Sequence, residues 1–427
     1  MSDKNALKSG IFDFISASPT AYHTVKNISE RLIANGFVPL LESEKWTLTK
    51  GGKYFVTRNF SSIIAFVVGD SGAPFMICAS HSDSPAFKVK EECVGAYNRL
   101  SVERYGSMIM YSWFDRPLSI AGRVLLKSEA GIVQKLFNID RDLLVIPSVA
   151  IHLSNKVNDG FAPNPAVDLY PLFSLDKNET LRSYLSRELS VDEEKILSHE
   201  TYLYAREKGA VIGADSDIIL APRLDNLGCV YASLEAFLSS KPTEACKVLA
   251  VFDNEEVGSS TKQGANSTFL SDTLERISES KEGYIRALSS SFMVSADNAH
   301  AKHPAHPELS DPANAPVLSG GIVIKHNANQ RYTTDAVSEA VFSEICKRAG
   351  AKTQHYYNRA DLPGGSTLGS IANTKVSVSS IDIGLPQLAM HSAVESAALS
   401  DVLEMISGLC GFYGSSISFE DSKIIIK

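Results

Sequence analysis

Residues 75–85 read FMICASHSDSP and combine a short apolar run with metal-ligand residues placed directly after it. The apolar part, Phe75 to Ala79, is bounded by Pro, Ser and Asp and is typical of a strand that is buried on both faces. His81 and Asp83 follow this strand at once. The same succession recurs twice downstream, after the apolar runs Lys247 to Phe252 and Phe292 to Ala296. We therefore expect three buried strands that each end in polar, ligand-type residues.

The residues after these strands form the candidate site. Asp253-Asn254-Glu255-Glu256 follows the second strand and Asp297 follows the third. In open α/β sheets, residues at the carboxyl ends of strands converge even when they are distant in sequence. Asp225, just before a helical pattern, and His391, soon after a later strand, lie in similar surroundings. We expect all of them to meet in one site.

The rest of the chain indicates an α/β fold. Two further buried strands are predicted at Ile63 to Val68 and Val376 to Ile383, and apolar residues recur at helical spacing over Leu227 to Leu238 and Ala336 to Ala349. This alternation of strands and helices favours a domain with a mixed, largely buried sheet.

The middle of the chain differs from its ends. Residues 94–217 are rich in Pro and Asn and contain short alternating runs such as Arg123 to Leu126. We interpret this segment as a β-rich insertion. The catalytic domain is then built from two pieces, residues 1–93 and 218–427, on either side of the inserted domain.

Composition limits the possible functions. The chain has 427 residues, is 44% hydrophobic and carries a formal net charge of −8 without a long block of like charges. Nucleic-acid binding is not expected, because it requires a basic face. No apolar run approaches the roughly 20 residues that cross a bilayer, and residues 1–9 lack the pattern of a signal peptide. We expect a cytoplasmic protein without a membrane segment. The six cysteines show no C-x-x-C pair, which argues against a zinc ribbon.

The ligand types point to metal-dependent hydrolysis. Two histidines and several carboxylates suit zinc, with manganese or cobalt as alternatives, since no thiolate joins them. One carboxylate can bridge two ions, which lower the pKa of a water between them so that hydroxide forms near neutral pH. The adjacent pair Glu255-Glu256 supplies one ligand and one general base. From the residues alone, the interpretation is a dinuclear metallohydrolase.

Several longer motifs carry a resemblance to a known family. They are His81-Ser82-Asp83-Ser84-Pro85, Ser18-Pro19-Thr20, Ile151-His152-Leu153, Arg223-Leu224-Asp225-Asn226, Asp253-Asn254-Glu255-Glu256-Val257-Gly258 and Pro386-Gln387-Leu388-Ala389-Met390-His391-Ser392. With these motifs the chain closely resembles, nearly end to end, the M18 family of metallo-aminopeptidases, which includes the aspartyl aminopeptidases.

The resemblance implies a role for each candidate ligand. His81 and Asp297 would bind one of two divalent ions, and Glu256 and His391 the other. Asp225 resembles the carboxylate that bridges them. The reaction implied is hydrolysis of the N-terminal peptide bond of peptide substrates.

The resemblance also implies roles beyond the ligands. Glu255 is similar to the general base, and Asp83 to the carboxylate that orients the metal-bound histidine. His152 resembles a histidine that reaches the active site of a neighbouring subunit and steadies the tetrahedral intermediate. Lys325 resembles the cation that contacts an acidic substrate side chain, which predicts a preference for N-terminal Asp or Glu.

The implied assembly is a homodimer formed through the inserted domain, and such dimers would build a tetrahedral homododecamer. Two departures from the family pattern, Ala166 and Gly364, bear on the subunit contact and the specificity pocket. The alternatives are an M18 enzyme that prefers neutral or hydrophobic residues, an N-acyl amino-acid deacylase with the same metal chemistry, and a shell protein without activity.

Overall fold

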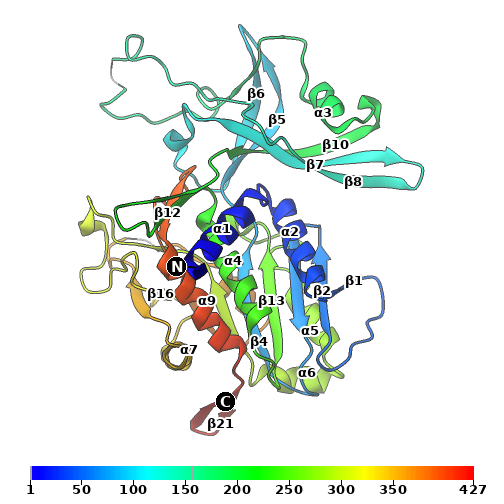
Figure 1. The fold of residues 1–427 in the computed structure, drawn as a ribbon, viewed down its shortest axis with the longest axis vertical. Helices are drawn as coiled ribbons and strands as arrows, with labels where there is room; N and C mark the ends of the chain where they lie inside the picture. The colour runs from blue at the N-terminus through cyan, green and yellow to red at the C-terminus, as the bar shows by residue number, and fades with distance from the viewer. Residues whose placement is uncertain (1, 156, 363) are drawn as a thin grey trace.

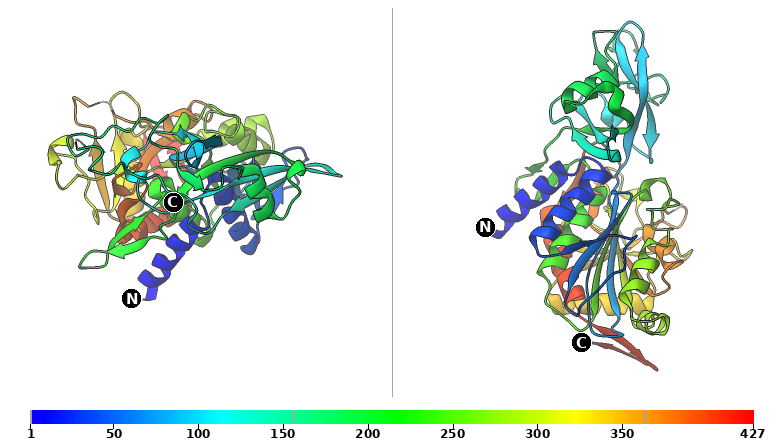
Figure 2. Two further views of the ribbon diagram at one scale, coloured as in Figure 1. Left: turned by 90° about the horizontal axis from the view of Figure 1, so that it is seen from above. Right: turned by 90° about the vertical axis from the view of Figure 1, so that its right-hand side faces the viewer.

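The computed structural model describes residues 2–155, 157–362 and 364–427, and it shows two lobes (Figure 1). The larger lobe contains both chain termini and a sheet that is flanked by helices. The smaller lobe, drawn in cyan and green, consists mainly of strands. The two lobes lie end to end in the right-hand view of Figure 2.

The larger lobe is built on a nine-stranded mixed sheet. Its strands, in spatial order, are β1 (Val38–Leu40), β2 (Lys53–Arg58), β3 (Ser62–Val67), β13 (Cys246–Phe252), β4 (Phe75–His81), β14 (Phe292–Ala296), β18 (Ser379–Gly384), β16 (Ile322–His326) and β17 (Thr353–Tyr357). The four strands β13, β4, β14 and β18 run parallel, whereas β3 and β16 are antiparallel to the strands that they join in this central group. Every residue of β4, β13 and β14 is buried, as expected for strands covered on both faces.

Helices cover both faces of this sheet. Their bounds are α1 (Ser2–Ser16), α2 (Ala21–Ala34), α4 (Leu224–Ser239), α5 (Phe269–Ile277), α6 (Lys281–Leu288), α7 (Ala336–Ala349), α8 (Leu368–Asn373) and α9 (Leu399–Tyr413). Residues of α1, α2, α4, α7 and α9 share one hydrophobic cluster with the sheet, and residues of α5, α6 and α8 share another. The sheet is thus the middle layer of three.

Local chemistry sets the ends of these helices. In α7, the Asp335 side chain accepts a hydrogen bond from the Ser338 backbone N–H at 2.8 Å, and the Ser338 hydroxyl faces the Asp335 N–H in return. Gly350 ends α7 with a left-handed φ of +73°, a conformation that glycine adopts without steric cost. The predicted helix over residues 336–349 is confirmed.

The five predicted strands are also confirmed, within three residues at their ends. They correspond to β3, β4, β13, β14 and β18. The predicted α/β fold with a mixed sheet is therefore correct.

The smaller lobe consists mainly of strands, and in the sequence it lies between the two parts of the larger lobe. Its six-stranded sheet has the order β8 (Gly131–Asn138), β7 (Leu118–Ser128), β10 (Ile196–Ala205), β5 (Ala86–Val94), β6 (Asn98–Tyr105) and β9 (Leu172–Ser174), and α3 (Leu181–Leu189) packs nearby. Phe87, Trp113 and Leu185 belong to a hydrophobic core that is separate from those of the larger lobe.

The sheet of the smaller lobe begins with β5 and ends with β10 along the chain, whereas the sequence analysis expects the insertion over residues 94–217. β5 begins at Ala86, and β11 (Ala210–Ile212) already belongs to a five-stranded sheet with β12 (Ile218–Ala221), β20 (Glu395–Ala398), β19 (Pro386–Leu388) and β15 (Ala299–His300). A two-stranded sheet, β21 (Ile417–Glu420) with β22 (Lys423–Ile426), lies near the C-terminus.

Among the described residues, no helix combines the length and the apolar character that crossing a bilayer requires.

Candidate metal centre

The carboxyl ends of three neighbouring strands bring the predicted ligands together. β4 lies between β13 and β14 and runs parallel to both, so the residues that end these strands share one edge of the sheet. His81 is the last residue of β4 and pairs with Phe252 of β13. Glu256 lies in the turn after β13, and Asp297 directly follows β14.

Two further predicted ligands come from elements outside these strands. Asp225 lies at the start of α4 and is 3% exposed. His391 follows β19 and has a left-handed φ of +66°, which is uncommon for a residue with a side chain. Glu395 fixes both positions, because its carboxylate accepts the backbone N–H of Asp225 at 2.9 Å and that of His391 at 2.7 Å.

The geometry divides these residues into two overlapping groups. His81 Nε2 lies 3.6 Å from Asp225 Oδ1 and 3.5 Å from Asp297 Oδ1. His391 Nε2 lies 3.3 Å from Asp225 Oδ2 and 3.5 Å from Glu256 Oε2. Each oxygen of Asp225 therefore faces a different histidine. We call His81, Asp225, Glu256, Asp297 and His391 the metal cluster.

The metal cluster has the donor chemistry that divalent zinc requires. Asp225 Oδ1 and Glu256 Oε1 are buried and have no hydrogen-bond partner among the described residues. A buried carboxylate oxygen without a partner is costly unless a cation is near. Imidazole and carboxylate ligands within 4.8 Å of one another match the usual ligands of Zn²⁺. The residues present thus fit a metal centre.

Burial and neighbouring charges perturb the ionisable groups of this region. Burial, followed by the charge of Asp225, raises the pKa of Glu256 well above its usual range. Burial raises the pKa of Glu255 to about 8. Burial opposes protonation of His81, but its contacts with Asp225, Asp297 and Asp83 outweigh this effect and raise its pKa. Such a cluster of perturbed groups is typical of a functional site.

Asp83 connects His81 to the turn that carries the two glutamates. Its carboxylate accepts the backbone N–H groups of Glu255 and Glu256, each at 3.2 Å, and its Oδ1 lies 3.3 Å from His81 Nδ1. The Nδ1 side of His81 therefore faces Asp83, which leaves Nε2 directed toward the metal cluster. An orienting role for Asp83 stays a prediction, and it would act through this contact with Nδ1.

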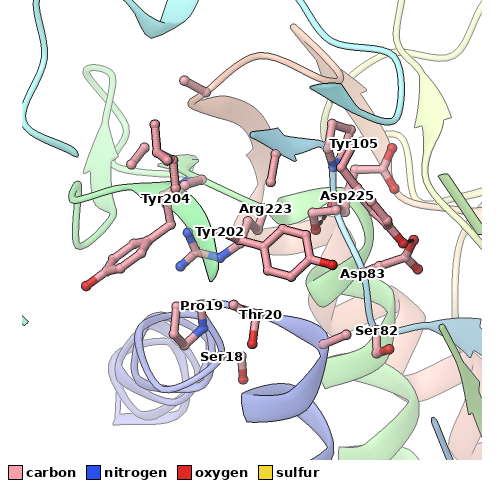
Figure 3. A pocket seen from close by; sticks show the side chains of 18 of the residues that line it. Ser18, Pro19, Thr20, Ser82, Asp83, Tyr105, Tyr202, Tyr204, Arg223 and Asp225 are labelled. Carbon is pink, nitrogen blue, oxygen red and sulfur yellow. Dashed lines mark hydrogen bonds between the residues drawn. The ribbon is translucent and has the colours of Figure 1, made fainter. Parts of the chain in front are cut away.

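The smaller lobe contributes groups to this region that no sequence pattern indicates. Tyr105, the last residue of β6, donates its hydroxyl to Asp83 Oδ2 at 2.7 Å. The next residue, Gly106, has φ of +77°, and a Cβ there would lie 3.1 Å from Glu256 Cβ. Figure 3 shows Tyr105, Asp83 and Asp225 together on the wall of a cavity of about 50 Å³ between the lobes. Neither Tyr105 nor Glu395 lies in a recognisable motif, so no sequence signal marked them.

Lys325 lies beside the metal cluster and is 2% exposed, unlike an ordinary surface lysine. Its ammonium donates to the Asn298 carbonyl at 2.8 Å and lies 3.5 Å from Asp297 Oδ2. Burial and then the charge of Lys325 lower the pKa of His300, which lines a neighbouring pocket of about 340 Å³.

His152 is the one predicted site residue that the fold does not bring to the cluster. It is exposed in the segment between β8 and β9 in the smaller lobe. Within the described ranges, no hydrogen bond or ion pair joins His152 to the other site residues. A single chain thus assembles every predicted site residue except this one.

Comparison with known proteins gives the same family as the sequence motifs. The family model described as aminopeptidase I zinc metalloprotease (M18) matches residues 14–413. A probable M18 family aminopeptidase 2 of Clostridium acetobutylicum is 44% identical over 421 residues, which cover 94% of this chain and 97% of the relative.

Solved structures also match over most of the chain. A chain in the cryo-EM structure of the Ape4 and Nbr1 complex superposes with a TM-score of 0.93 at 36% identity, covering 96% of this chain and 86% of that one. A chain in the structure of the S. cerevisiae mApe1 dodecamer superposes with a TM-score of 0.83 at 25% identity, covering 97% of each chain. The suspected resemblance is confirmed, and the chain belongs to the M18 family of aminopeptidases, which are metal-dependent hydrolases.

Proposed function

We propose that this aminopeptidase uses two divalent ions, with Glu255 as general base, to release single residues from peptide N-termini, and that it prefers Asp and Glu. The observation that carries the proposal is the position of Asp225, whose two oxygens face two different histidines. A carboxylate in this position suits a bridge between two ions.

The residues of the metal cluster would be shared between the two ions. His81 and Asp297 would hold one ion, Glu256 and His391 would hold the other, and Asp225 would contact both. When bound, such a pair of ions polarises the scissile carbonyl and lowers the pKa of a nearby water. The ligand types favour zinc, and Mn²⁺ and Co²⁺ are the alternatives that metal analysis would distinguish.

Glu255 would move the proton. It belongs to the same group of ligand-type atoms as His81 and Glu256, all within 4.8 Å of one another. A carboxylate there can accept a proton from the attacking water and pass it to the leaving amine. In the metal-free site, burial raises the pKa of Glu255 to about 8.

The acidic preference rests on Lys325. The charge of its buried ammonium acts on His300 and Tyr356, both of which line the neighbouring pocket. A substrate carboxylate in the pocket would gain from that charge in a setting with little water.

A panel of aminoacyl substrates tests this preference. We expect faster release of N-terminal Asp or Glu than of Leu, and we expect Lys325→Met to lose the acidic substrates selectively. Lys302→Met, which removes an exposed lysine, is the control. Equal or faster release of Leu by the unaltered enzyme would reject the acidic preference in favour of a neutral one. Cleavage of N-acyl amino acids in place of peptides would favour the deacylase alternative.

The inserted lobe would mediate assembly. The segment between β8 and β9 exposes apolar side chains that a single chain leaves uncovered: Val149, Ile151, Leu153, Phe161 and Val167. One related structure is a dodecamer. We infer homodimers that build a tetrahedral dodecamer, in which His152 reaches a neighbouring active site. Mass measurement in solution tests the assembly, and a monomer with full activity would contradict it.

A further inference from the structure

A second group of metal-ligand side chains lies on the side of the large sheet where β17 is the outermost strand. His326 ends β16, His355 lies in the edge strand β17, and Glu339 lies in the first turn of α7. β16 and β17 run parallel, with Ile324 opposite His355, so both imidazoles come to the same part of this edge. We call His326, Glu339 and His355 the edge cluster. It shares no residue with the metal cluster.

The distances within the edge cluster match those of a coordination shell. His326 Nε2 lies 3.1 Å from His355 Nδ1, and His355 Nδ1 lies 3.7 Å from Glu339 Oε1. For metal–ligand bonds of about 2.0–2.1 Å, tetrahedral geometry places neighbouring ligand atoms roughly 3.3–3.4 Å apart. The two observed distances lie on either side of that value, and all three ligand atoms are within 4.8 Å of one another. Only small side-chain shifts would be required for all three atoms to coordinate one ion.

The cluster is held in place on one side and open on the other. The ring of Tyr357 stacks on His326 with centroids 4.5 Å apart and planes 4° from parallel, which fixes the orientation of that imidazole. His326 is 8% exposed, whereas the side chains of His355 and Glu339 are 42% and 35% exposed. Burial lowers the pKa of His326, so its ring is in the neutral form that binds metals.

We propose that His326, His355 and Glu339 bind a further divalent transition ion, such as Zn²⁺, separate from the catalytic ions, with a fourth position open to water. Two imidazoles and one carboxylate favour a borderline ion over Mg²⁺ or Ca²⁺, which prefer oxygen ligands. The ion would connect α7 to the two outer strands of the sheet.

Metal content measured on the purified holoenzyme tests the proposal. The enzyme is equilibrated with Zn²⁺, freed of unbound ion and analysed by mass spectrometry beside His355→Gln and Glu339→Gln. We expect each variant to hold one equivalent per subunit less than the unaltered protein. His306→Gln is the matched control, because His306 is also an exposed histidine that faces a glutamate, Glu308, at 3.0 Å. We expect it to keep the full metal content.

A second measurement separates loss of the site from loss of the fold. Both variants change partly exposed side chains, and we expect their circular dichroism and aminopeptidase activity to stay at the unaltered level. Added Zn²⁺ should raise the Tm of the unaltered holoenzyme but not that of the two variants. Equal metal content in all four proteins, or an equal loss in His306→Gln, would overturn the proposal.

Discussion

The metal cluster and the segment that carries His152 differ in whether a single chain brings the predicted site residues together. The metal cluster draws its five side chains from well-separated parts of the larger lobe and holds most of them buried. The segment between β8 and β9 instead exposes His152 beside apolar side chains such as Leu153, which is 82% exposed. One chain therefore brings the predicted ligands together, whereas the role inferred for His152 requires a second chain. Changes to the two regions should differ accordingly.

The largest effect is expected at the general base. Glu255→Gln removes the proton acceptor but no inferred ligand, so kcat should fall by about 10²–10⁴-fold while metal content stays unchanged. Steady-state kinetics and metal analysis on the same preparation measure both quantities. Glu193→Gln, in an exposed acidic pair of the smaller lobe, should have no effect. Loss of a metal ion from Glu255→Gln would show that the roles of Glu255 and Glu256 are interchanged.

A change in the smaller lobe tests the other side of the comparison. His152→Ala should lower kcat by about 10²–10³-fold, because a donor to the developing oxyanion would be lost from each neighbouring site. The metal content and the mass of the assembly should not change. Mixing His152→Ala with Glu255→Gln subunits should restore part of the activity, since each would supply what the other lacks. Unchanged kcat in His152→Ala would remove His152 from the mechanism.

A smaller effect is expected where one residue positions two ligands. The Glu395 carboxylate receives two backbone N–H groups, whereas a Gln side chain has only one oxygen to offer. Glu395→Gln should therefore weaken metal affinity by about 10–100-fold. Activity measured against the concentration of free Zn²⁺ gives this shift, and saturating metal should restore most of kcat. An unchanged metal dependence would mean that Asp225 and His391 are held in place by other contacts.

The smallest effect concerns the contact between the lobes. Tyr105→Phe removes one hydrogen bond to Asp83, which keeps the two backbone N–H groups of the Glu255–Glu256 turn. A loss of about 1 kcal/mol, or roughly fivefold in kcat, is expected. Tyr97→Phe, at an exposed tyrosine of the smaller lobe, is the control. A loss as large as that of Glu255→Gln would mean that Tyr105 acts on the substrate directly.

The buried centre of the fold could be predicted from the sequence because its signal is local. Strands such as β4 and β14 are covered on both faces, so each appears as a continuous apolar run with polar residues after it. The outer strands β16 and β17 were not predicted. β17 reads TQHYY and is only partly buried, so it lacks such a run. The predicted metal ligands at the buried strand ends were recognisable because they directly follow these apolar runs.

The supporting residues could not be predicted in this way. Glu395 and Tyr105 act through hydrogen bonds to residues 170 and 22 positions away, respectively. Nothing in their neighbouring sequence differs from that of an ordinary glutamate or tyrosine. The edge cluster was missed for the same reason, since its three members are separated along the chain and meet only through β16, β17 and α7.

The sequence by itself determined the central strands, the ligand types that follow them and, through its motifs, the family. These depend on short-range patterns of burial and on residue chemistry, both of which are written along the chain. Only the tertiary structure decided which oxygen faces which histidine, that Glu395 and Asp83 hold the ligands, and that His152 stays apart from them. Such contacts join residues that are distant in sequence, so their geometry exists only once the strands and helices have packed together.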